Sequence, residues 1–120
     1  MAGRYDFTIK QGSTFSMAIK WKEGNLLTNL EGYSARMQIR YNNYKGGIAA
    51  DLTVDNGGIE VDLFNQHIKV YISAEDTARI KPIPCVYDLE VVKDEFVERI
   101  LEGKVSISPE VTRWKNILLL

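Results

Sequence analysis

Residues 33–41 alternate between apolar and polar side chains without interruption. Successive side chains of a β-strand point to opposite faces, so this period of two predicts a strand with one buried face and one wet face. A slip of one residue would bury both Arg36 and Arg40, so we expect a strongly specified register. The predicted core-facing row is Tyr33, Ala35, Met37, Ile39 and Tyr41.

The same alternation recurs along the chain and predicts about eight strands. The other alternating segments are residues 5–9, 14–21, 48–54, 59–63, 67–72, 85–91 and 96–107. Turn-forming residues separate them, as at 42–47 and 55–58. Short strands at spacings of about 8–12 residues are typical of an all-β sandwich.

One short helical segment is expected at residues 73–80. Ser73 can cap it, Asp76 stands at the third helical position, and Pro82 follows its end. We therefore predict an immunoglobulin-like (Ig-like) antiparallel β-sandwich with one short helical crossover. In such folds an early Tyr of the next strand hydrogen-bonds back to the crossover, and Tyr87 is predicted to do so.

We divide the chain into a sandwich domain, residues 1–113, and an apolar C-terminal docking tail, residues 114–120. Burial of the apolar side chains of the tail would stabilise it by about as much as the loss of backbone entropy on ordering would cost. Main-chain hydrogen bonds would have to supply the remaining stability. We therefore expect the tail to add a strand to a sheet edge, in this chain or in a neighbour. Its predicted partner-binding residues are Trp114, Ile117, Leu118, Leu119 and Leu120.

Composition narrows the classes of partner. The chain has 120 residues with 45% hydrophobic and 26% charged residues, which suits one domain with a core. A net charge of -1 argues against nucleic acid as a partner. Residues 1–7 contain no apolar run, so no secretory signal is expected, and no segment has the ~20 apolar residues of a membrane span.

No catalytic, cofactor-binding or metal-binding residues are predicted, and the protein is not expected to be an enzyme. His67 is the single histidine, and no acidic residue and nucleophile stand near it at a spacing that would indicate a catalytic site. We therefore expect it in a hydrogen bond or in solvent. Cys85 has no second Cys and no nearby His, so it is expected to pack as a small apolar residue. The carboxylates of residues 88–102 fall on wet faces and at a turn, where cross-strand pairing is the expected role.

A second group of candidate partner-binding residues lies near the end of the 33–41 strand. Arg36 and Arg40 are on its wet face, and Tyr41 and Tyr44 follow at the 42–47 loop. A solvated face is the simpler interpretation, but Arg and Tyr are enriched in protein interfaces.

Six segments together resemble a family of small tailed-phage proteins. They are 7–15, Trp21, 30–40, 72–78, 87–90 and 101–112, and the likeness covers about residues 7–112. This family is similar to the Ig-like N-terminal domain of phage baseplate upper proteins, which dock receptor-binding proteins onto the virion. The resemblance implies no catalytic residues, and residues 114–120 lie outside it.

From this resemblance we expect a structural or adaptor protein of a phage virion, in the tail, neck, baseplate, fibre attachment or capsid decoration. Its expected partners are other phage structural proteins and copies of itself, with no nucleic acid, membrane, small-molecule substrate or cofactor. It would be made in the host cytoplasm and located in the virion. The alternative is a module that binds cell-surface glycans through Tyr41, Tyr44 and the 42–47 loop.

Overall fold

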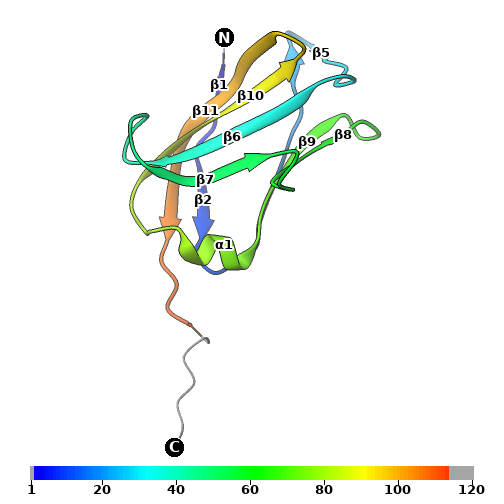
Figure 1. Ribbon diagram of the computed structural model, residues 1–120. Coiled ribbons are helices and arrows are strands. Elements are labelled where there is room, and N and C mark those ends of the chain that lie inside the picture. Colours follow the sequence, from blue (N-terminus) through cyan, green and yellow to red (C-terminus); the bar gives the residue numbers. More distant parts are fainter. Residues whose placement is uncertain (1, 114–120) are drawn as a thin grey trace, which may run out of the picture.

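The computed structural model describes residues 2–113, which form two β-sheets packed face to face, a small hairpin and one short helix (Figure 1). The larger sheet contains β1 (Gly3–Arg4), β2 (Phe7–Lys10), β6 (Ser34–Tyr41), β7 (Ile48–Thr53), β10 (Cys85–Lys93) and β11 (Phe96–Ser108). The smaller sheet contains β3 (Phe15–Ile19), β8 (Ile59–Asp62) and β9 (His67–Ile72). The hairpin is β4 (Lys22–Glu23) with β5 (Leu26–Leu27), and the helix is α1 (Ala74–Arg79).

The strand order confirms the Ig-like sandwich. The larger sheet runs β1-β11-β10-β6-β7, with β2 also paired to β11, and the smaller runs β3-β9-β8. These orders match the GFC and BED sheets of Ig domains, with β3 in the place of strand B and β11 in the place of strand G. Eight of the strands have four or more residues, as predicted, and β1, β4 and β5 add two residues each. The pairing is antiparallel except that β1 and β2 run parallel to β11.

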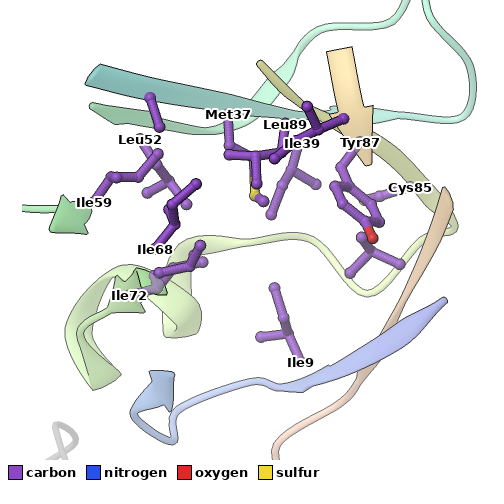
Figure 2. Close-up of a cluster of buried hydrophobic side chains, with 14 of the residues drawn as sticks. Ile9, Met37, Ile39, Leu52, Ile59, Ile68, Ile72, Cys85, Tyr87 and Leu89 are labelled. Carbon is purple, nitrogen blue, oxygen red and sulfur yellow. The ribbon is translucent and has the colours of Figure 1, made fainter. Parts of the chain in front are cut away.

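Strand β6 lies inside the larger sheet, between β10 and β7. Its alternation is confirmed, since Ala35, Met37 and Ile39 are buried. Met37 is opposite Leu89 of β10 and Leu52 of β7, so the three apolar rows meet on the same face. Side chains from both sheets point toward one another in the resulting core (Figure 2).

The crossover helix begins and ends where the sequence predicted. Ser73 caps it by accepting a hydrogen bond from the Asp76 amide at 3.1 Å, and Ile80 is the C-cap. The fully buried Thr77 joins the helix to the β2–β3 turn. Its hydroxyl donates to the Ser13 carbonyl at 2.8 Å and accepts from the Gly12 amide at 3.0 Å. The chain therefore passes from the larger sheet to the smaller one at a turn fixed by the helix.

The role predicted for Tyr87 is wrong. Its hydroxyl donates to the Tyr5 carbonyl at 2.5 Å, and not to the crossover backbone. The reason is the irregular stretch between β1 and β2, which approaches β11 closely. A Cβ at Gly103 would collide with the Tyr5 carbonyl oxygen, and the Lys104 amide donates to Asp6 at 2.8 Å. Glycine at position 103 therefore lets the N-terminal segment come within reach of Tyr87.

Candidate functional site

One end of the sandwich carries exposed apolar side chains on a turn, on a short hairpin and at the start of a strand. This end lies opposite α1 and is formed by residues 20–33, the β8–β9 turn and the β10–β11 turn (Figure 1). Phe64 is 95% exposed and Leu26 is 76% exposed, and three further side chains are about half exposed. We call this set the apolar end: Leu26, Leu27, Leu63, Phe64 and Phe96.

The β8–β9 turn, which carries Leu63 and Phe64, is closed by Asp62. Its carboxylate accepts hydrogen bonds from the Asn65 amide at 3.0 Å and the Asn65 side chain at 2.9 Å. His67 Nε2 lies 3.2 Å from the same carboxylate. The Asn65 side chain, the Asn65 amide and His67 hold the pKa of Asp62 well below its usual range. The turn is therefore held by a carboxylate that stays ionised under ordinary conditions.

The neighbouring segment, residues 20–33, is anchored to the same turn. Leu30 is fully buried, and its amide donates to the Gln66 side-chain oxygen at 2.9 Å. The Trp21 and Tyr33 rings meet edge to face at 5.4 Å, and Phe96 contacts Tyr33 at 6.4 Å between ring centroids. The exposed apolar side chains thus project from hydrogen-bonded and packed backbone.

Sequence reasoning missed this set. The alternation of Ile59, Val61 and Leu63 predicted a strand through Leu63, but β8 ends at Asp62 and Leu63 lies exposed in the turn. The available signal was two pairs of adjacent apolar residues, one in the short β4–β5 hairpin (26–27) and one in the β8–β9 turn (63–64). Two adjacent apolar residues in so short a segment cannot both face the core, so such pairs indicate exposed apolar surface.

The predicted arginines make contacts within the larger sheet. Arg36 donates to Glu90 of β10 at 2.8 Å. Arg40 donates to the Gly46 carbonyl at 2.9 Å and to Gln38 at 2.8 Å, so it fixes the 42–47 loop. All three contacts agree with the simpler interpretation of this face as a solvated sheet surface.

The two predicted tyrosines separate in the structure. Tyr41 is half-buried, and its hydroxyl accepts a hydrogen bond from the Lys81 amide at 3.0 Å. Tyr44 is 76% exposed and lines an open depression of about 460 Å³ on the outer face of the larger sheet. Asp88 lies in the same depression, where burial and the neighbouring Glu90 raise its pKa. This face therefore offers the exposed Tyr44 ring, over which the Lys45 ammonium lies at 5.6 Å, beside polar groups.

The predicted tail, with Trp114 and Ile117–Leu120, lies outside the described residues. The segment that leads to it is attached at the α1 end, where the Glu110 amide donates to the Gln11 side-chain oxygen at 2.9 Å. From there the chain leaves the sandwich, and Val111 is almost fully exposed (Figure 1). The described part of the chain thus ends on the α1 side of the domain, opposite the apolar end.

The other chemically notable groups take part in packing or turn structure. Cys85 is buried, and burial raises the pKa of its thiol. His67 contacts Asp62, in agreement with the predicted hydrogen-bonded role. Within residues 2–113, no group of three or more His, Cys, Asp or Glu side chains is placed to hold a metal ion. In the same range, no helix is long and apolar enough to cross a membrane.

These features define an all-β sandwich of Ig-like strand order with a set of exposed apolar residues at one end. No protein-family model matches the sequence, and no curated protein matches it significantly.

Proposed function

We propose that this protein is a non-enzymatic structural or adaptor component of a phage particle, which acts through protein–protein contacts. The observation that carries the contact role is the apolar end. The segments that carry its side chains are held by hydrogen bonds to Asp62 and Gln66 and by the contact between Trp21 and Tyr33. Exposed apolar groups on ordered segments mark interaction sites. The phage assignment rests on the sequence resemblance over residues 7–112, which agrees with the Ig-like strand order.

Incorporation into particles tests this function. The chain is supplied during infection by a phage that lacks the gene, and its copies per purified particle are counted by mass spectrometry. We expect the wild-type chain in the particle and at least a tenfold loss for the double variant Leu26→Ser/Phe64→Ser. Both side chains are exposed, so the variant should keep the wild-type fold.

The matched control is Ile48→Ser, which removes a half-exposed apolar side chain of edge strand β7, away from the apolar end. It should be incorporated like the wild type. Absence of the wild-type chain from particles would refute the phage role. Normal incorporation of the double variant would refute the contact role of the apolar end.

Glycan binding is the second candidate function, and exposed Tyr44 favours it. Sugars stack on aromatic rings and hydrogen-bond to polar groups, and the depression beside Tyr44 is lined by Arg40, Asn43 and Asp88. The hydroxyl of Tyr41 is already engaged by Lys81, which leaves a platform of one ring. A glycan array with the wild type and Tyr44→Ala decides this: binding that Tyr44→Ala abolishes would support the glycan module.

A further inference from the structure

The two apolar features of this chain lie at opposite ends of the domain. Strand β11 begins with Phe96 of the apolar end and finishes at Ser108, close to the turn at Gln11. Its thirteen residues cover about 40 Å. After Ser108 the chain continues away from the sandwich toward residues 114–120 (Figure 1).

Residues 114–120 have the composition of a docking segment. Their sequence is one Trp, then Lys and Asn, then Ile117 and three leucines. A buried Trp covers ~150–250 Å², and four aliphatic side chains add on the order of 300–400 Å². Asp94 and Glu95 directly precede Phe96 in the chain, but Lys93 also reaches this end, with its ammonium 5.1 Å from the centre of the Tyr33 ring. The segment therefore matches the apolar end in apolar character.

The tail cannot cover the apolar end of its own chain. Seven extended residues span at most ~25 Å, which is shorter than the sandwich from Ser108 to Phe96. In addition, residues 109–113 already lead away from the domain (Figure 1). A second copy placed end to end has no such restriction, because its apolar end can lie directly beyond Arg113.

We propose that residues 114–120 of one copy bind the apolar end of the next copy, head to tail. This inference rests on the proposed contact role of the apolar end and names its occupant. The contact is heterologous: each copy offers a tail at one end and a receiving surface at the other. Repetition of such a contact builds a ring if the rotation closes and a filament if it does not. The area falls at the small end of the specific interfaces, so a single contact is expected to be weak and concentration-dependent.

Complementation between two full-length variants tests the proposal. The tail variant carries Ile117→Ser, Leu118→Ser, Leu119→Ser and Leu120→Ser and keeps the apolar end. The end variant carries Leu26→Ser and Phe64→Ser and keeps the tail. Molar mass is measured by sedimentation up to ~1 mM, where even a contact with a millimolar Kd is formed in roughly a third of the copies.

We expect the wild type to form species larger than a dimer as its concentration rises. Each variant alone should remain monomeric, and an equal mixture should form a one-to-one complex that grows no further. Ile48→Ser is the control and should associate like the wild type. Circular dichroism melts of all four proteins verify that each one is folded.

Several outcomes would overturn the proposal. They are a monomeric wild type at every concentration, self-association of the end variant, and a mixture that forms no complex. A tail variant that melts well below the wild type when dilute would place the tail on its own domain, which also contradicts it. The particle experiment distinguishes failure of the contact role from failure of the head-to-tail arrangement. If the end variant is lost from particles while the mixture forms no complex, the contact role stands and the head-to-tail arrangement is wrong.

Discussion

Adjacent residues of β6 experience opposite environments. Met37 is 1% exposed and lies between Leu89 and Leu52 of the flanking strands. Arg36 points from the other face of the sheet and pairs with Glu90 at 2.8 Å. The contrast follows from the period of two alone, because one step along the strand changes the face on which a side chain lies.

Substitution of these two neighbours tests the register. Met37→Asp places an unpaired charge in the core, which costs several kcal/mol against a total stability of ~5–15 kcal/mol, so this variant should not fold. Arg36→Asp loses an exposed ion pair worth at most about 1 kcal/mol and should fold. Thermal melts followed by circular dichroism check both, and equal stability of the two variants would show that the register is wrong.

The hydroxyl of Tyr87 should control part of the stability at alkaline pH. Burial, together with the nearby Asp6 and Tyr5, raises the pKa of Tyr87 from 10.0 to about 12. The folded state therefore holds this proton more tightly than the unfolded state does. The contribution is complete below pH ~10 and is lost as the pH rises through about 12.

Tyr87→Phe keeps the ring against Phe7 but removes the hydrogen bond to the Tyr5 carbonyl, which should lower stability by about 1 kcal/mol at neutral pH. The variant should also lose less stability than the wild type between pH 9 and pH 12. Urea unfolding across this range measures both effects, and exposed Tyr44→Phe is the control that keeps the wild-type profile. Parallel profiles for Tyr87→Phe and the wild type would contradict the prediction.

The β8–β9 turn shows how a side chain can end a strand. The alternation of apolar residues continues through Leu63, yet the carboxylate of Asp62 binds the Asn65 amide and folds the backbone into a turn at that point. The period of two predicts which face of the sheet a side chain occupies, but it does not predict where the strand ends. The end of the strand depends on local side-chain hydrogen bonds. Alternation alone therefore could not place Leu63 and Phe64 in a turn.

Asp62 also makes this turn sensitive to acid. Because its folded-state pKa is depressed, its contribution to stability is complete above the unfolded value of ~3.9 and is lost as the pH falls through the lower folded value. Asp62→Asn should destabilise the protein at pH 6, and the gap to the wild type should narrow toward pH 2.5. Urea midpoints at the two pH values measure the gap. Asp55→Asn, in the exposed 55–58 turn, is the control, and a constant gap for Asp62→Asn would argue against this role of the carboxylate.

At the scale of the whole molecule, the sequence predicted the architecture more completely than the surfaces. The eight longer strands, the capped crossover and the buried Cys85–Val91 row follow from alternation and turn chemistry, which are local. The bond from Tyr87 to Tyr5 was not predictable, because it requires the close approach that Gly103 permits between distant segments. The apolar end was missed for a similar reason, since three separate turns form it only after the sheets have packed.

The parallel pairing of β2 with β11 has a mechanical consequence. The register joins Phe7 to Val105 and Lys10 to Ser108, while the chain enters β2 from β1 at one end of this pair and leaves β11 through residues 109–113 at the other end (Figure 1). A pull between those ends acts along both strands, so the hydrogen bonds that join them are strained together in shear and cannot open one after another. Stretching the chain must therefore break all the hydrogen bonds between β2 and β11 almost simultaneously. A domain built in this way resists stretching along the direction of these two strands.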